Sequence, residues 1–465
     1  KITLSISSRM SVPEIKAVVS LTLVFIFRML GLFMVLPVLV LYAEDLQGVT
    51  PTLAGLAIGA YGFSQALLQI PVGWLSDKVG RKPVIIAGLL LFLAGSLVAA
   101  YADTIQWIII GRLLQGCGAI AGALTALMAD VTRDQYRTRA MAMVGMGIGV
   151  SFCLAMIIGP LIGSHWGLSG LFLSNALMSV AAILVVIFLV PSPIITRKDL
   201  NTNVQKRDMY NVIRNPQLMR HCIGAGALHF VLMALFVFVP QTLEQNAGYA
   251  RADHGWIYLA LMGLSFIAII PMILFSEKRR TLKQCYIAAV TIILASMAAL
   301  YQGDIFPNHL LAGLFLFFMA FNFLEATLPS LVSKLSPAGT RGTAMGMFTT
   351  SQFLGAALGG IGGGWALEHW GITGVLIACT IPTALWWLLS VTMKQPPYVS
   401  SIVMALYPCE HQAQQTVDDV HRLGKQLAII PGVEEVTVLP EERTAYLKVD
   451  RRHLDITALQ RFGEC

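Results

Sequence analysis

Long apolar runs, each followed by a short polar segment, make up most of the first 394 residues. A helix that crosses the ~30 Å hydrocarbon layer of a membrane needs roughly 20 mainly apolar residues. Twelve runs meet that length, at approximately 17–42, 52–75, 83–101, 105–129, 140–164, 168–190, 221–243, 255–276, 284–301, 308–333, 343–367 and 371–393. Because apolar and polar residues do not alternate within them, we expect helices and not the strands of an outer-membrane barrel.

The composition agrees with a membrane protein and changes how the net charge is interpreted. Hydrophobic residues are 56% of the chain and charged residues 12%, about half the usual charged share of a soluble domain. The net charge of +7 divides into +10 for residues 1–398 and −3 for residues 399–465. With both ends of the span region inside, 22 Lys and Arg fall on the inner side and one, Arg251, on the outer side. This asymmetry predicts cytoplasmic termini and no nucleic-acid partner.

The twelve runs divide into two related halves. A long basic loop at 191–220 separates an N-terminal six-helix bundle (1–190) from a C-terminal one (221–394). HWGLSG at 165–170 recurs as HWGITG at 369–374, so the last two runs of each half correspond. Repeated six-helix halves are typical of secondary carriers, whose substrate site lies near the membrane midplane between the halves.

The string GWLSDKVGRKPVII at 73–86 follows the second run. Its glycine permits close helix packing, its aspartate can face a helix N-terminus, and its basic residues suit headgroups or a partner carboxylate. As an isolated charge pattern it is also typical of an ordinary basic turn. The full string resembles the signature of the major facilitator superfamily in this loop, through Gly73, Asp77, Gly80, Arg81 and Lys82.

Three further strings extend the resemblance over about residues 17–394. GRLLQGCGAIAGA at 111–123 is similar to the family's fourth-span motif, and GVSFCLAMIIGPLIG at 149–163 to the fifth-span motif of its drug:proton antiporter branch. The first-span segment from Arg28 to Pro37 resembles the same branch. The matching positions are Arg112, Gln115 and Gly116 in the fourth span, and Gly149, Gly159, Pro160 and Gly163 in the fifth. The resemblance implies twelve helices in two bundles.

Four ionisable residues lie within the predicted spans, where such groups are costly and often functional. Glu325 is the one acid deep in a span, and we expect it either to carry a proton or to be a buried partner of Asn322. Arg28 either attracts an anionic group or serves the structure, and His229 is either functional or a satisfied interior histidine. Arg112, supported by the motif, is either part of the site or a structural anchor of its bundle.

A second group of charges is expected to form a gate. The family resemblance places Asp130 near Arg81, and Asp77 should face the start of the eleventh span at Gly342 and Gly346. These contacts would hold the cytoplasmic side shut in the outward-facing state. Protonation of a carboxylate there or deeper would then release it.

The polar tail at 399–465 reads as a small α+β domain. Strands are expected at 402–406, 433–439 and 444–449, with helices at 412–430 and 454–462 and a hairpin turn at 440–443. This order is a ferredoxin-like plait without its last strand. The segment after the first strand holds Cys409, Glu410 and His411 in place of a CxxC pair, so no metal site is predicted. Its charge of −3 suggests docking on the basic cytoplasmic loops.

No nucleophile–base constellation, phosphate loop or ATP-binding motif is found, so an enzyme is not predicted. The leading hypothesis is a proton-driven exporter of small hydrophobic or drug-like molecules in the bacterial inner membrane. It would act as a monomer in contact with lipids, with no cofactor and the proton gradient as its energy source. A proton-coupled uptake permease and a membrane sensor with vestigial transport are the alternatives.

Overall fold

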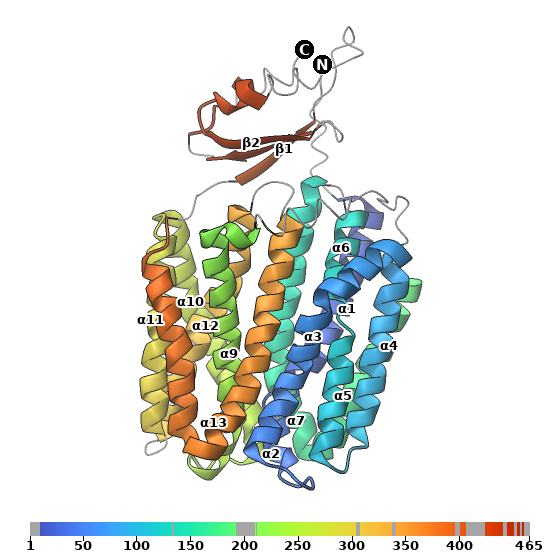
Figure 1. The fold of residues 1–465 in the computed structure, drawn as a ribbon, viewed down its shortest axis with the longest axis vertical. Helices are drawn as coiled ribbons and strands as arrows, with labels where there is room; N and C mark the ends of the chain where they lie inside the picture. Colours follow the sequence, from blue (N-terminus) through green and yellow to red (C-terminus); the bar gives the residue numbers. More distant parts are fainter. Residues whose placement is uncertain are drawn as a thin grey trace.

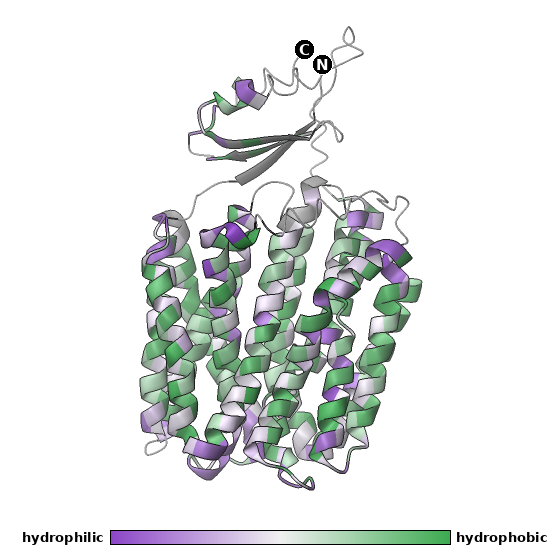
Figure 2. Cartoon of the chain, viewed as in Figure 1, coloured by the Kyte–Doolittle hydropathy of each residue, from purple (hydrophilic) through white to green (hydrophobic). Residues whose placement is uncertain are grey.

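The computed structural model describes residues 10–132, 134–191, 210, 212–303, 307–336, 341–395, 400–405, 424–439, 444–450, 453–455 and 458–459. Two groups of helices stand side by side, and a small sheet lies beyond one end of them (Figure 1). We call that end of the bundle the sheet end and the other the far end. Hydrophobic residues cover the middle of the bundle and hydrophilic ones collect at its two ends (Figure 2).

The first group of helices contains seven segments: α1 (Val12–Phe33), α2 (Leu39–Ala43), α3 (Pro51–Val79), α4 (Arg81–Ala100), α5 (Ile105–Cys117), α6 (Ala121–Val131) and α7 (Asp134–Phe188). The second group contains α9 (Pro216–Gln245), the 3₁₀ turn η1 (Arg251–Asp253), α10 (His254–Lys278), α11 (Leu282–Gly303), α12 (Pro307–Leu335) and α13 (Arg341–Val391). The helix α13 packs most extensively on α9 and on α3, so it joins the two groups.

Ten helices among the described residues are long and apolar enough to cross a membrane. Two of them, α7 and α13, are more than twice the needed length and bend at Gly167 and Gly371. Each therefore supplies two crossing segments, which gives the predicted total of twelve. The two glycines have nearly the same backbone angles, φ 62° with ψ −160° and φ 64° with ψ −163°, in the left-handed region that favours glycine. They occupy matching positions of the sequence repeat, so both halves turn in the same way.

Three predicted boundaries are wrong. The run at 17–42 is broken by a turn at 34–38, because Pro37 lacks an N–H and disfavours helical backbone in the residue before it. The run at 105–129 is broken between α5 and α6, where Gly118 packs directly on the backbone of Gly88. The predicted loop 191–220 ends early: α9 begins at Pro216, and the Asn215 side chain caps it by accepting from Gln217 N at 3.0 Å.

The C-terminal part contains the three predicted strands, β1 (Ser400–Ala405), β2 (Val433–Leu439) and β3 (Thr444–Val449). They form one antiparallel sheet in the order β1-β3-β2, with Leu447 of β3 paired to Ile402 and to Val436. Its small core includes Leu427, at the end of the predicted first helix. The rest of that helix, the segment with Cys409, the hairpin turn and most of the last helix lie outside the described residues.

One ion pair connects the sheet to the helices. Arg280 Nη2, at the C-terminal end of α10, lies 2.7 and 2.9 Å from the two carboxylate oxygens of Asp450, directly after β3. The Asp450 side chain is 12% exposed, and His453 Nδ1 contacts the same carboxylate at 3.0 Å. An acid of the tail thus meets a basic residue of an interhelical loop, as the opposite charges of the two parts suggest.

Candidate functional site

Three polar side chains from three helices meet in the second half of the bundle. Glu325 of α12 accepts a hydrogen bond from the amide Nε2 of Gln352 on α13, at 3.2 Å from Oε1. His229 of α9 lies on the other side, with Nε2 at 3.8 Å from Glu325 Oε2 and 3.4 Å from Gln352 Nε2. The Glu325 side chain is 31% exposed and that of His229 13%, so the cluster is reachable and partly enclosed.

The hydrogen bonds of His229 fix the chemistry of this contact. Its Nδ1 lies 3.0 Å from the carbonyl oxygen of Ala225, an acceptor, so Nδ1 carries the proton. In the neutral ring Nε2 is then an acceptor, and it faces Glu325 Oε2, which has no hydrogen-bond partner among the described residues. Two acceptors that face each other across this gap can both be satisfied by one added proton. The pair is therefore a site that can hold a proton.

Asn322 does not take the predicted part in this site. It is 8% exposed on α12, and its amide Nδ2 has no hydrogen-bond partner among the described residues. The expectation that Asn322 pairs with Glu325 is wrong, because residues three apart on one helix share a face while the closer donor comes from a neighbouring helix.

Arg28 lies in the first half of the bundle, on α1. Its Nη2 donates to Gln65 Oε1 at 2.7 Å and to the Tyr61 hydroxyl at 3.1 Å, both on α3, and Gln65 in turn donates to Gln69 at 2.8 Å. The Arg28 Nε and Nη1 atoms have no partner among the described residues. A cation with a chain of neutral amides, and with no carboxylate among these contacts, leaves positive charge in the membrane interior.

Arg112 is held as a structural anchor, one of its two expected roles. It is fully buried on α5, where Nη1 donates to Gln115 Oε1 at 2.9 Å and Nε to the carbonyl of Ala57 at 3.3 Å. Gln115 passes the network to Ser96 Oγ at 2.8 Å. All of these contacts stay within the first group of helices. Gly116 lets α3 approach, because an added Cβ would collide with Ser64 and Tyr61.

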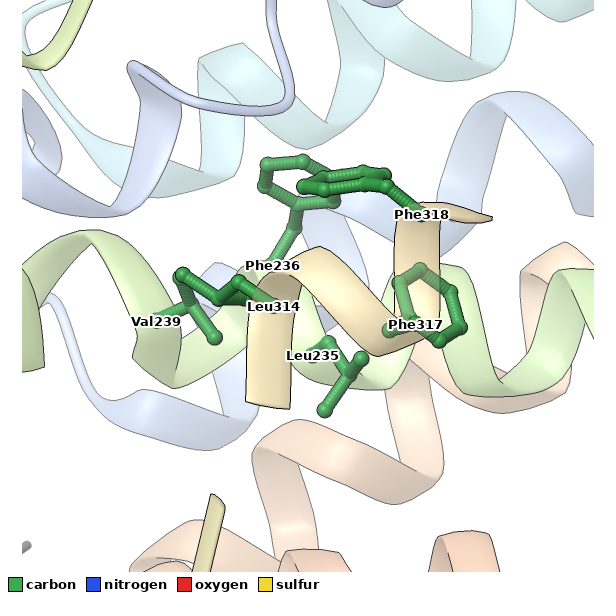
Figure 3. A pocket seen from close by; sticks show the side chains of 6 residues that line it. All are labelled: Leu235, Phe236, Val239, Leu314, Phe317 and Phe318. Atoms are coloured by element: carbon green, nitrogen blue, oxygen red, sulfur yellow. The ribbon is translucent and has the colours of Figure 1, made fainter. Parts of the chain in front are cut away.

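Aromatic rings line the space next to the proton pair. Phe321 on α12 lies 6.1 Å from the His229 ring and 5.5 Å from Phe152 of α7, so the rings cross from one half of the bundle to the other. Further pairs join Phe152 to Phe33 at 5.0 Å and to Phe318 at 6.3 Å. A small pocket between α9 and α12, lined by Leu235, Phe236, Val239, Leu314, Phe317 and Phe318, is entirely apolar (Figure 3).

The signature loop forms an ion-pair network at the sheet end. Arg81 pairs with Asp77 one turn earlier, lies 3.2 Å from Asp130 Oδ2 at the end of α6, and donates to Ser76 Oγ at 2.7 Å. Gly80, with φ 110°, makes the sharp turn between α3 and α4 that brings these groups together. Lys82 is half-buried in the first turn of α4. The expected neighbourhood of Arg81 and Asp130 is therefore present.

The two halves touch at the far end and separate toward the sheet end. On α3, a Cβ added at Gly59 would lie 2.6 Å from the carbonyl oxygen of Ala357 on α13, and Gly55 packs as closely on Gly360. At the sheet end, by contrast, a Cβ added at Gly342 or Gly346 would have no neighbour within 4 Å. The expected approach of Asp77 to the start of α13 is thus not made in this conformation.

Ion pairs also join the halves at the far end. Glu44, next to α2, accepts from Gln241 Nε2 of α9 at 2.8 Å and lies 3.3 Å from Arg251 Nη2. Arg251 also binds Glu244 at 2.7 Å. Arg251 is the single cation that the sequence places on the outer side. We call Glu44, Gln241, Glu244 and Arg251 the far-end clasp.

A backbone contact adds to the link between the halves. The Thr52 N–H, in the first turn of α3, donates to Glu368 Oε2 near the bend of α13 at 3.0 Å. It lies at the same end of the pair α3–α13 as the close packing of Gly55. Polar and steric contacts therefore close the same end.

The fifth-span glycines have different surroundings. Gly159 and Gly163 of α7 pack on the turn after α1, where added Cβ atoms would lie 2.6 Å from Met34 O and 2.7 Å from Val38 Cγ1. Pro160 lies inside the helix between them, and Gly149 has open space around it. The motif therefore fits α7 against the first span.

Sequence reasoning missed Gln352, Tyr61 and the far-end clasp. Gln352 is a polar residue in the middle of an apolar run, and Arg251 is the one exception to the charge asymmetry, so both had a signal. Within the described part of the chain, no group of three or more His, Cys, Asp or Glu side chains is placed to hold a metal ion.

Comparison with known proteins identifies the family. The model of the Major Facilitator Superfamily matches residues 21–360 and 222–408. The inner membrane transport protein YajR of Escherichia coli (strain K12) is 42% identical over 444 residues, 96% of each chain. The multidrug resistance protein MdtH of Yersinia enterocolitica is 28% identical, over 78% of this chain and 88% of its own.

Solved structures share the fold. A D-xylose-proton symporter aligns with a TM-score of 0.64 and 14% identity, over 83% of this chain and 98% of its own. The nucleoside transporter NupG aligns with a TM-score of 0.62 and 17% identity, over 82% and 98%. At these identities the likeness concerns the fold alone. The matches to the family model and to YajR, together with the twelve crossing segments, show that this chain is an inner-membrane transporter and belongs to the major facilitator superfamily.

Proposed function

We propose that this protein is a proton-driven exporter of small hydrophobic or drug-like molecules that works by alternating access. The observation that carries the proposal is the pair Glu325–His229, in which an unpartnered carboxylate oxygen faces the acceptor nitrogen of a neutral imidazole at 3.8 Å. A proton that binds there removes the buried negative charge and supplies the missing hydrogen bond, and its loss restores both costs. Proton uptake and release thus change the free energy of this region.

The conformation supports alternating access. The far end is held by the clasp and by glycine packing between α3 and α13, while the start of α13 at the sheet end is free of close neighbours at Gly342 and Gly346. With the sheet end on the cytoplasmic side, as the basic loops predict, this is the inward-facing state. In the opposite state, Asp77 would approach the start of α13 while the clasp opens.

The aromatic cluster supports a hydrophobic substrate. Phe152, Phe318 and Phe321 come from both halves and lie beside His229, so a ligand between the halves would contact rings and the proton site together. Such apolar lining with few polar groups is typical of small-molecule sites. The name of the relative MdtH, a multidrug resistance protein, agrees with export.

The C-terminal sheet is proposed to belong to a ferredoxin-like cytoplasmic domain. The order β1-β3-β2 is the order of the first three strands in that plait, and the pair Arg280–Asp450 links it to the bundle. Both termini would then be cytoplasmic, and the carrier would act as a monomer that uses the proton gradient without a cofactor.

Export is tested with purified protein in two steps. A thermal-shift screen against small molecules at two pH values first identifies a compound whose binding depends on pH. That compound is then followed in proteoliposomes with an imposed pH gradient. An antiporter accumulates it in the acidic compartment, whereas a proton-coupled uptake permease accumulates it in the alkaline one. Glu325→Gln should bind the compound but lose the gradient-driven accumulation, and uphill transport retained in this variant would contradict the proposal.

A further inference from the structure

Gln352 contacts both members of the proton pair. Its amide Nε2 donates to Glu325 Oε1 at 3.2 Å and lies 3.4 Å from His229 Nε2, the acceptor nitrogen of the ring. An amide nitrogen has two hydrogens, which suits two acceptors. Gln352 therefore holds α13 to α12 and to α9 at one point.

The two contacts of His229 Nε2 exclude each other. A neutral imidazole has one lone pair on this nitrogen, so it accepts from the amide of Gln352 or from a protonated Glu325, but not from both. When a proton occupies the gap between Glu325 and His229, the amide of Gln352 loses its second acceptor. Proton binding thus changes how α13 is held.

Gln352 also lies where the two halves begin to separate. The next residue, Phe353, packs on α3, where a Cβ added at Gly62 would lie 2.8 Å from its carbonyl oxygen. The Phe353 ring is 6.1 Å from Tyr61, which is bonded to Arg28. From this point to the far end α3 and α13 are in contact, and toward the sheet end Gly346 has no close neighbour.

The other charged groups near this region are accounted for. Among the described residues, His229 is the one titratable side chain in hydrogen-bond or ion-pair range of Glu325. Across the interface, Arg28 on α1 and Arg112 on α5 are bonded within the first half. On α13 itself, Glu368 lies at the far end, bonded to Thr52.

We infer that Gln352 is the positioning residue that couples the proton on Glu325–His229 to the separation of α3 and α13. The inference rests on the proposed function, since it needs the pair to bind the coupling proton. It adds the element through which the proton acts. Glu325 and His229 would bind the proton without Gln352, but the helices would no longer respond to it.

The test replaces Gln352 by methionine, which keeps the length and removes both donors. Spin labels on cysteines that replace Val79 of α3 and Phe275 of α10, both exposed at the sheet end, report the separation of the halves in a cysteine-free background. The share of molecules open at the sheet end is measured by double electron–electron resonance from about pH 5 to about pH 8, where an exposed histidine titrates. Thr350→Val is the matched control, because the Thr350 hydroxyl is buried without a partner two residues away.

With native Gln352, and in the Thr350→Val control, the open share is expected to change by about fivefold or more across this range, and in Gln352→Met it should change by less than about twofold. A change of the native size in a folded Gln352→Met variant would overturn the inference. Gln352→Leu serves as a second variant if methionine lowers the yield of folded protein. Failure of the proposed function has a different signature, because Glu325→Gln would then keep the native pH response.

Discussion

Replacement of Gly59 by alanine should shift the carrier away from the conformation described above. The new methyl group would lie 2.6 Å from the carbonyl oxygen of Ala357 and 3.1 Å from the Ile361 side chain on α13. Ordinary van der Waals contact begins at about 3.4 Å, so α3 and α13 must move apart by almost 1 Å. The clash is with backbone, which a side-chain rotation does not relieve.

The cost falls on one state. Overpacking of this kind costs about 1–3 kcal/mol, and the clash exists only where the far ends of α3 and α13 are closed. The ratio of far-end-closed to far-end-open molecules should fall by about 5- to 150-fold. Alanine also stabilises a helix by about 1 kcal/mol relative to glycine, but equally in both states, so this gain does not change the ratio.

The assay is the distance between spin labels at the sheet end, on cysteines replacing Val79 and Phe275. Gly59→Ala should lower the share of molecules that are open there. Gly263→Ala on α10 is the matched control, because its added Cβ has open space within 4 Å. An unchanged ratio in a folded Gly59→Ala variant, equal to that of the control, would refute the packing argument.

Three further predictions follow from the ion pairs. Asp77→Asn should cripple transport at normal expression, because the inner gate loses its charge; unchanged transport would refute the gate. Arg251→Gln should raise the share of molecules open at the far end, measured by cysteine accessibility there, because Glu44 loses its inter-half cation; a share equal to that of the native protein would count against the clasp. Asp450→Asn or high salt should increase the mobility of a label on the sheet, since the pair with Arg280 is a partly exposed, screened contact; mobility unchanged by either would show that the docking is not electrostatic.

Much of the fold followed from pattern because the membrane restricts the solutions. A run of about 20 apolar residues has few alternatives to a helix in lipid, so the number of spans was predictable. The repeated HWG strings predicted the equivalence of the halves, and their glycines Gly167 and Gly371 adopt the same conformation. The interruptions near Pro37 and Gly118 depend on local backbone chemistry and on one neighbouring helix, which a hydropathy run does not show.

The candidate site was predictable in its charges and not in its partners. Glu325 and His229 stood out as ionisable residues in apolar spans, but their meeting requires α9, α12 and α13 to be placed in space. The choice of Asn322 as partner failed for the same reason. The predicted contact of Asp77 with the start of α13 belongs to a second conformation, and one sequence encodes both states while a structure describes one.

The most direct test of proton coupling compares the native protein with Glu325→Gln in the spin-label assay at the sheet end. In the native protein, the share of molecules open at the sheet end should rise by about fivefold or more as the pH falls from about 8 to about 5, because protonation of the pair favours the inward-facing state. In Glu325→Gln, whose side chain cannot titrate, the share should be independent of pH. A Glu325→Gln variant that responds to pH as the native protein does would contradict the assignment of the coupling proton to this pair.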